Sequence, residues 1–335
     1  GQRYGAKDFK ACGETYVHAL FLALVGGLLI AAAGALGAEP LYRVMGADSA
    51  VVSQGAGYFR LYILSAPLTL ATYCSIGFYR GVQNSRVPML IAFMITAMQL
   101  TMDYTLIYGR FGQPALGLVG AAVAACCSQF AGAMVYMELF FYSAETRKYR
   151  ALSWRITATG LRPLFRIGQD LAIRTGALRL SLIFATSTAA RMGAATLSAY
   201  EIVFQLFMLC SDVVDGLAIA GQALAAKYLG SGEAQRAYRM GVTILLCGIV
   251  AGLLFTVSFT VAWKTIVEFF TTSDAVIALL TPAVMILVCL IQPLNATVFV
   301  LDGLLIGARD TRYLMWAMLA GAAITVPIAW LSWRF

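Results

Sequence analysis

Residues 237–263 read AYRMGVTILLCGIVAGLLFTVSFTVAW, and no charged residue lies between Arg239 and Lys264. A helix of about 20 apolar residues crosses the roughly 30 Å hydrocarbon layer of a membrane, where a charged side chain is costly. The stretch is therefore long enough and apolar enough to span a membrane. It is far too long for a strand of a membrane barrel and does not alternate as such strands do, so a helix is expected.

The rest of the chain has a similar composition. Of its 335 residues, 61% are hydrophobic and 12% are charged, whereas soluble domains contain about 25% charged residues. This composition excludes an ordinary soluble domain, and the seven cysteines follow no spacing typical of a metal or redox site. Similar apolar blocks predict about nine membrane helices, at 15–41, 57–78, 87–108, 116–142, 167–192, 196–226, 237–263, 276–306 and 314–333.

Positive charge is distributed unevenly between the loops. The loops on one side hold most of the lysines and arginines, whereas the alternate loops hold only Arg43, Arg110 and Lys264. Short loops rich in lysine and arginine stay in the cytoplasm. We therefore expect a multi-pass protein of a bacterial-type inner membrane, with its basic loops in the cytoplasm beside anionic lipid headgroups and with no nucleic-acid partner.

The chain contains an internal repeat. Aligning residues 48–89 with residues 274–315 without a gap brings rare residue types into register, which chance achieves less readily than matching leucines. Six predicted helices separate each segment from its copy, so both copies cross the membrane in the same direction. The identical pairs include Asp48 and Asp274, Pro67 and Pro293, Gly77 and Gly303, Gly81 and Gly307, and Arg86 and Arg312.

The repeat predicts an all-α integral membrane protein with two pseudo-symmetric six-helix bundles. The first bundle takes residues 1–146, a charged cytoplasmic linker takes residues 147–166, and the second bundle takes residues 167–335. The second bundle begins with two helices that lack copies in the first, and the last helix of the first bundle lacks a copy in the second. About nine of twelve helices would then be present, so we expect a partial chain.

Small residues recur at one helical spacing in both copies of the repeat. Gly77 and Gly81 are four residues apart, as are Gly303 and Gly307. Pairs of small residues at this spacing allow membrane helices to approach closely. Both pairs are therefore predicted to lie in helix packing interfaces.

Several runs of sequence resemble a known family of membrane proteins. Residues 199–224, AYEIVFQLFMLCSDVVDGLAIAGQAL, are similar to the eighth helix of the multidrug and toxic compound extrusion (MATE) family. QPLN at 292–295 and LDGLLIGA at 301–308 resemble its tenth helix, and QDLAIR at 169–174 resembles the seventh helix of its DNA-damage-inducible F (DinF) branch. The resemblance covers nearly the whole chain, with family helices 3–6 in the first bundle and 7–11 in the second.

The resemblance implies a secondary antiporter that exports small organic compounds, cationic or amphipathic, in exchange for protons or sodium ions. It also implies a monomer that holds no cofactor or metal. A flippase for lipid-linked oligosaccharide, from the same superfamily, is the alternative, although its cavity would be expected to hold basic residues. A membrane-embedded enzyme is less favoured, because one histidine and short loops offer no catalytic cluster.

The first bundle holds one acidic candidate for ion coupling. In the family, the fifth helix typically carries Asn-x-x-x-Asp, and this chain has Gln99 and Asp103 at those positions. A charge at the bilayer centre costs about 2.5–3.5 kcal/mol, so it needs a partner or water. Asp103 is therefore a candidate proton or cation acceptor, with Gln99 beside it. The structural alternative is a helix-end residue that is hydrogen-bonded locally.

Three carboxylates share one predicted helix of the second bundle. At about 3.6 residues per turn, Glu201 and Asp212 fall within about 20° of each other around the helix, and Asp215 lies about 60° away. A stripe of carboxylates should avoid lipid, so it is predicted to line a transport cavity or to bond to neighbouring helices. The family usually has glutamine at the position of Glu201.

The predicted helix at 167–192 carries charges that need partners. Asp170 and Arg174 are four residues apart and are therefore neighbours on one side of the helix. We predict a structural ion pair between them, because pairing lets both side chains enter the membrane at lower cost. Asp302, near the basic side, is predicted to cap or pack there.

Overall fold

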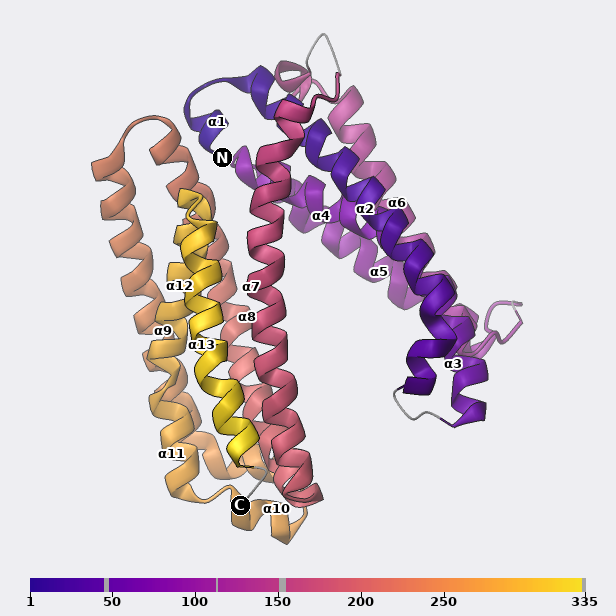
Figure 1. Ribbon diagram of the computed structural model, residues 1–335, viewed down its shortest axis with the longest axis vertical. Helices are drawn as coiled ribbons and strands as arrows, with labels where there is room; N and C mark the ends of the chain where they lie inside the picture. The colour runs from indigo at the N-terminus through magenta and orange to yellow at the C-terminus, as the bar shows by residue number, and fades with distance from the viewer. Residues whose placement is uncertain (45–47, 113, 151–154, 333–335) are drawn as a thin grey trace. The chain divides into compact units, whose positions relative to one another are not determined.

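The computed structural model is helical wherever its regular structure is described. Apart from its first two residues, the chain divides into two compact units, unit 1 at Arg3–Phe165 and unit 2 at Arg166–Phe335. Figure 1 follows the chain from its indigo N-terminal helices to its yellow C-terminal helix. The residues that the structure describes are 1–44, 48–112, 114–150 and 155–332.

Unit 1 contains the helices of the first predicted bundle. The predicted span at 57–78 is divided into α3 and α4, which are bent by 45° at the break. Pro67 lies in the first turn of α4, where the missing N–H of proline leaves no hydrogen bond unmade. The helices up to the linker are α1 (Gln2–Gly5), α2 (Phe9–Val44), α3 (Ser49–Ile63), α4 (Ala66–Gly81), α5 (Arg86–Tyr108), α6 (Leu118–Tyr142) and the short 3-10 helix η1 (Arg147–Tyr149).

Unit 2 contains the helices of the second predicted bundle, with α7 entering it at Arg166. The predicted span at 276–306 is divided into α10, α11 and α12. Thr281 caps α11 by accepting a hydrogen bond from the Val284 backbone N–H at 3.4 Å, and Pro293 lies in the first turn of α12. The helices are α7 (Ala158–Arg191), α8 (Ala194–Gly230), α9 (Ala234–Phe270), α10 (Asp274–Leu279), α11 (Pro282–Leu290), α12 (Gln292–Ala308) and α13 (Thr311–Leu331).

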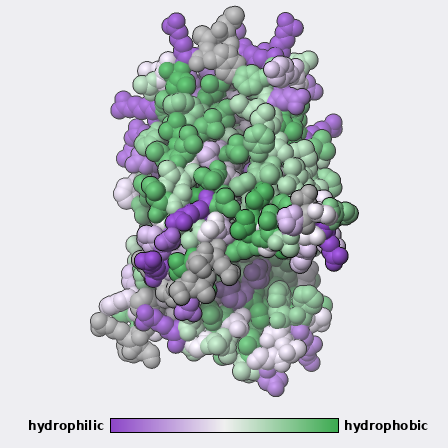
Figure 2. All heavy atoms as spheres, turned by 90° about the vertical axis from the view of Figure 1, so that its right-hand side faces the viewer, coloured by the Kyte–Doolittle hydropathy of each residue, from purple (hydrophilic) through white to green (hydrophobic). Residues whose placement is uncertain are grey.

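Most of these helices have the length and composition of membrane spans. Seven helices in the described part of the chain are long and apolar enough to cross a membrane, and the bent pair α3–α4 makes an eighth. Figure 2 shows hydrophobic residues over much of one face, as contact with lipid requires. The chain is therefore a multi-pass membrane protein, and the prediction of an all-α membrane fold is confirmed.

The helix predicted at 167–192 differs from the other spans. It is present as α7, but α7 begins at Ala158, inside the predicted linker. Arginine and aspartate residues interrupt its apolar positions, so it is not among the seven helices with the composition of a span. Of its 34 residues, only Ala177 and Ala189 are buried within the described structure. Polar contacts join α7 to its neighbours, among them hydrogen bonds from Arg174 to Asp302 of α12 and from Thr311 of α13 to Asp170.

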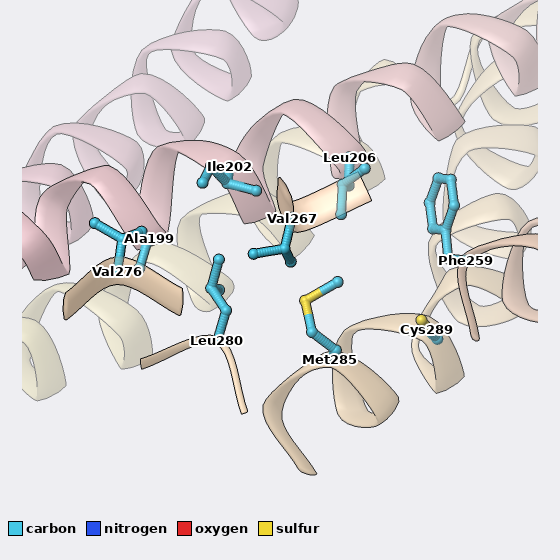
Figure 3. Packing of buried hydrophobic residues seen from close by; sticks show 9 residues of the cluster. All are labelled: Ala199, Ile202, Leu206, Phe259, Val267, Val276, Leu280, Met285 and Cys289. Atoms are coloured by element: carbon cyan, nitrogen blue, oxygen red, sulfur yellow. The ribbon is translucent and has the colours of Figure 1, made fainter. Parts of the chain in front are cut away.

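Each unit has an apolar core of its own. In unit 1, the rings of Tyr16 and Phe140 lie 4.5 Å apart between α2 and α6. In unit 2, Figure 3 shows side chains from several helices converging on one cluster. Burying such side chains contributes packing contacts that fix each helix against its neighbours. The buried residues of that cluster are Ala199, Ile202, Leu206, Phe259, Val267, Val276, Leu280, Met285 and Cys289.

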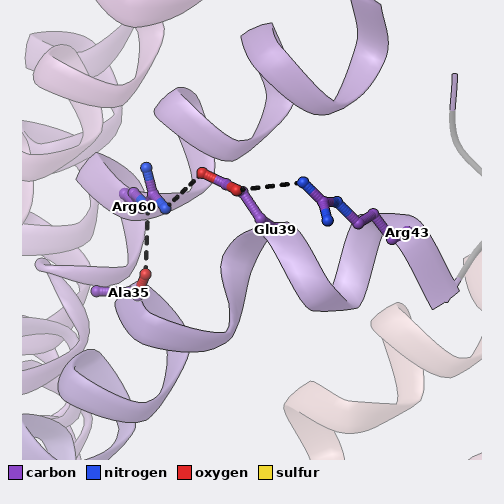
Figure 4. A network of polar contacts seen from close by, with 4 residues as sticks. All are labelled: Ala35, Glu39, Arg43 and Arg60. Carbon is purple, nitrogen blue, oxygen red and sulfur yellow. Dashed lines mark hydrogen bonds and ion pairs between the residues drawn. The ribbon is translucent and has the colours of Figure 1, made fainter. Parts of the chain in front are cut away.

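An exposed ion-pair network connects the C-terminal part of α2 to α3 (Figure 4). Glu39 Oε1 accepts a hydrogen bond from Arg60 Nη2 at 2.8 Å, and its Oε2 lies 3.8 Å from Arg43 Nη2. Arg60 Nε also donates to the Ala35 carbonyl oxygen at 3.3 Å. Exposed ion pairs contribute about 0–1 kcal/mol, so this network orients the helix ends more than it stabilises the fold.

Candidate functional site

The candidate site of unit 2 is built on two helices that pack closely, α8 and α12. A Cβ added to Gly303 would lie 2.4 Å from the Ala218 carbonyl oxygen, and one added to Gly307 would lie 2.5 Å from that of Gln222. Both glycines are buried. Only a residue without a side chain allows so close an approach, so these glycines determine which face of α12 meets α8.

The corresponding glycines of unit 1 have different surroundings. Gly77 is exposed, and a Cβ added to it would meet no described atom within 4 Å. A Cβ added to Gly81 would lie 3.1 Å from the backbone nitrogen of Gly1. Among the described residues, Gly303 and Gly307 therefore pack against the backbone of a neighbouring long helix, whereas Gly77 and Gly81 do not.

An ion pair joins α7 to α12. Arg174 Nη2 donates to Asp302 Oδ1 at 2.5 Å, and the two side chains are 19% and 21% exposed. Arg174 Nε is buried and has no hydrogen-bond partner among the described residues. A charge-assisted hydrogen bond of this kind offsets part of the cost of removing both groups from water.

The predicted partner of Arg174 was Asp170, and the structure corrects this pairing. Asp170 Oδ2 accepts a hydrogen bond from the Thr311 hydroxyl of α13 at 3.1 Å, while Arg174 pairs with Asp302. A charged residue can pair with a residue four positions away on its own helix or with a residue on a neighbouring helix. In this structure Asp302 of α12 is the partner of Arg174, and Thr311 of α13 is the partner of Asp170. Asp302 therefore serves as an ion-pair partner and not as a helix cap.

The three carboxylates of α8 lie on the side of the helix away from the apolar core. Glu201, Asp212 and Asp215 are exposed within unit 2, whereas α8 buries Ile202, Val214 and other apolar residues. The stripe predicted from the sequence is therefore present. Asp215 lies on α8 and Asp302 on α12, the two helices that approach closely at Gly303 and Gly307.

Unit 1 holds a carboxylate with one buried oxygen that has no hydrogen-bond partner among the described residues. Asp103 lies on α5 and is partly buried, and the oxygen is its Oδ1 atom. Gln99, one turn earlier on α5, is also partly buried. A carboxylate oxygen in this setting favours binding a proton or a cation.

Gln129 of α6 is another side chain of unit 1 with an unsatisfied acceptor, and no feature of the sequence selected it. Its Oε1 atom is buried without a partner in the described part of the chain. The helices α5 and α6 pack closely, since a Cβ on Gly132 would lie 2.3 Å from Ile95 Cδ1. A glutamine within an apolar helix is a weak signal by itself, because amides often bond to nearby backbone.

Comparison with known proteins identifies the family. A family model described as MatE matches residues 1–105 and 177–331. The chain belongs to the MatE family. It is 27% identical over 310 residues to Protein DETOXIFICATION 43 of Arabidopsis thaliana, and the match spans 92% of this chain but 55% of that protein. It is 27% identical over 342 residues to DNA damage-inducible protein F of Escherichia coli strain K12, spanning 99% of this chain and 72% of that protein.

Solved structures show the same fold. The outward-facing conformation of a multidrug resistance MATE family transporter of the MOP superfamily matches 98% of this chain and 82% of that chain, with a TM-score of 0.76 and 18% identity. The predicted membership of the MATE family, with a DinF-type relative, is confirmed. The solved structure that this MatE chain resembles is described as a transporter.

The MatE match includes most of the candidate residues. Asp103 lies inside its first segment. Asp215 and Asp302 lie inside its second segment, as do the other two carboxylates of the α8 stripe. Arg174 lies between the two segments. The ion pair of unit 2 therefore joins a residue within the MatE match to one outside it.

Proposed function

We propose that this MatE protein is a secondary active antiporter that exports organic cations or amphipathic compounds in exchange for protons or sodium ions. The observation that carries the proposal is the Asp103 carboxylate of unit 1, which has a buried oxygen without a hydrogen-bond donor among the described residues. In a membrane helix, such an oxygen binds a proton or a cation more favourably than it stays alone.

Exchange follows from competition at the carboxylate. One charged carboxylate compensates either a bound coupling ion or a bound organic cation, and the protein gains little by holding both. Arrival of one ligand then favours release of the other. Alternating access to the two sides of the membrane converts this competition into antiport. The membrane would be a bacterial-type inner membrane with the basic loops in the cytoplasm, and the transporter would be a monomer.

Transport in everted membrane vesicles tests the proposal. Vesicles containing the complete gene product should accumulate a fluorescent organic cation when a proton or sodium gradient is imposed. Asp103→Asn should lower the ion-driven rate by about tenfold or more, because the neutral amide cannot bind the coupling ion. Glu268→Gln is the matched control, since the Glu268 side chain is 56% exposed at the end of α9. Equal rates in the Asp103→Asn variant and the control, at equal protein abundance, would refute the role of Asp103.

A further inference from the structure

Unit 1 has a cavity at the end where α4 and α6 finish and α5 begins. Its volume is about 400 Å³, which lies within the range of small-molecule sites. The lining comes from α1, from the turn after α4 and from residues 144–149. Asp103 lies about 25 Å further along α5, at 1.5 Å per residue, so this cavity is separate from the proposed coupling site.

One part of the lining contains a buried hydroxyl group without a partner. Tyr79 is 3% exposed, and its hydroxyl forms no hydrogen bond with the described residues. Asn84 also lines the cavity, and its Oδ1 accepts a hydrogen bond from the Val87 backbone N–H at 3.3 Å, which leaves its Nδ2 group free to donate. A buried donor without an acceptor is costly. A ligand with acceptor oxygens would remove that cost.

Another part of the lining combines an aromatic ring with one positive and one negative charge. Lys148 and Tyr149 both line the cavity, and Lys148 Nζ lies 5.0 Å from the Tyr149 ring centroid. Glu145 lines the cavity as well, and neither it nor Lys148 forms an ion pair within the described part of the chain. Because aromatic rings also attract ammonium groups, this lining suits a ligand that carries both an anion and an ammonium.

The segment that carries these charges is fixed against α2 and α6. The Thr146 hydroxyl donates to the Phe140 carbonyl oxygen at 2.8 Å, and Arg150 Nε donates to the same oxygen at 3.1 Å. Gly13 of α2 leaves no space for a Cβ beside the Tyr149 carbonyl oxygen. The segment is therefore part of the packed unit, and the cavity is formed without a ligand.

This end of unit 1 is rich in basic residues. Arg80 lies in the last turn of α4, Arg86 begins α5, and Arg147 begins η1. Such residues near helix ends interact with the phosphates of lipid headgroups at the cytoplasmic surface of a membrane. The cavity therefore lies at the end of unit 1 that is predicted to meet these headgroups.

We propose that this cavity binds a phosphate ester that carries an ammonium group, as the headgroup of phosphatidylethanolamine does. The phosphate oxygens accept hydrogen bonds from the Tyr79 hydroxyl and the Asn84 amide, and they pair with Lys148. The ammonium group pairs with Glu145 beside the Tyr149 ring. Free phosphoethanolamine has the same chemistry, so lipid and free compound are tested side by side. The inference does not depend on the proposed antiport.

Thermal unfolding of the complete gene product in detergent tests the site. Phosphatidylethanolamine should raise the Tm by about 3 °C more than phosphatidylglycerol, whose headgroup has a phosphate but no ammonium. A rise with the lipid alone supports the site and identifies a lipid as its ligand, whereas an equal rise with free phosphoethanolamine supports it with a soluble ligand. The proposal is overturned if phosphatidylglycerol stabilises the protein as much as phosphatidylethanolamine does.

Tyr79→Phe removes the hydroxyl and keeps the ring. Without lipid, the variant should unfold at the parent's temperature or above it, because a buried unpaired group is lost. It should lose at least half of the rise caused by phosphatidylethanolamine. Tyr136→Phe is the matched control and should keep the whole rise, since Tyr136 also has a buried hydroxyl without a described partner but does not line the cavity. Equal lipid responses in the two variants would overturn the proposal.

Two charge variants test how the headgroup is recognised. Glu145→Gln should abolish the preference for phosphatidylethanolamine over phosphatidylglycerol, and Lys148→Gln should weaken the binding of both lipids. Arg147→Gln is the control, because it removes a charge from the same segment outside the cavity lining. Native mass spectrometry counts the bound lipids in each variant, so a variant of lower stability is still measured. Lipid binding and preference equal to those of Arg147→Gln in both charge variants would overturn the proposal.

Discussion

Gly252 of α9 lies directly against Pro293 of α12, so that a Cβ added to the glycine would fall 2.5 Å from Pro293 Cα. Unit 1 contains the same contact, since a Cβ on Gly27 of α2 would fall 2.4 Å from Pro67 Cα of α4. Pro67 and Pro293 are the two prolines that the sequence repeat aligns, and each lies in the first turn of its helix. The repeat therefore extends to this contact between a glycine and the aligned proline, although the matched glycine pairs have different surroundings.

These contacts predict opposite effects for neighbouring glycines. Gly27→Ala should destabilise the protein by about 1–3 kcal/mol, because the added methyl group meets backbone of α4. Gly26→Ala is the matched control, since a Cβ there meets nothing within 4 Å. It should be neutral or stabilising by up to about 1 kcal/mol, because alanine favours a helix more than glycine does. Thermal unfolding in detergent measures both, and equal Tm values for the two variants would contradict the contact.

The two matched glycines of the repeat should also respond differently. Gly303→Ala should lower the Tm, since its Cβ would lie 2.4 Å from the Ala218 carbonyl oxygen. Gly77→Ala should leave the Tm unchanged or raise it, because the face of α4 around Gly77 is open within unit 1. A fall in Tm for Gly77→Ala as large as that for Gly303→Ala would show that a further part of the molecule covers this face.

The ion pair between α7 and α12 should show strong coupling. Asp302→Asn leaves a partly buried guanidinium unpaired and should cost about 3–5 kcal/mol. Replacing both residues, as in Arg174→Met/Asp302→Leu, should cost less than the sum of the single changes, because no unpaired charge remains. A double-mutant cycle on thermal or denaturant unfolding measures the difference. Additive effects would show that the two charges do not interact in the folded protein.

The acidic stripe of α8 should affect transport and leave folding intact. Glu201→Gln replaces the carboxylate by a neutral amide and should change the pH dependence of efflux or the preference among substrates. Asp215→Asn should reduce efflux further, because it removes a charge from α8, the helix that packs closely against α12. Efflux is followed in vesicles across pH, with protein abundance measured alongside. Parental rates and pH profiles in both variants would assign these carboxylates a structural role.

The sequence was informative about the membrane helices because their signal is local. Long apolar blocks predicted the helices, and the aligned Pro67 and Pro293 contributed to the predicted repeat, without any three-dimensional information. The breaks within the spans at 57–78 and 276–306 were not predicted and come from the structure.

The helix at 167–192 has a weaker local signal than the other spans, because it carries charged residues. Two of these, Asp170 and Arg174, contact other helices. Its N-terminal turns from Ala158 were also assigned to the linker, since charged residues there resemble a loop in composition.

The site could be predicted only in part. The sequence selected Asp103 and the α8 stripe because a carboxylate in an apolar helix is unusual wherever its partner lies. It could not pair Arg174 with Asp302, since that contact joins residues far apart in the chain, and a neighbour four residues away was the nearer choice. Gln129 was missed for a related reason. An amide in an apolar helix becomes notable only when the structure shows that its Oε1 has no partner.

Counter-ion flux through the reconstituted protein tests the central claim most directly. The complete gene product is placed in liposomes that contain a pH-sensitive or sodium-sensitive dye, and an outward gradient of an organic cation is imposed without any ion gradient. The account predicts that the organic cation leaves and drives protons or sodium inward, and that Asp103→Asn abolishes this inward flux. Export of the organic cation at the same rate with no opposing ion movement, in the parent protein, would contradict antiport.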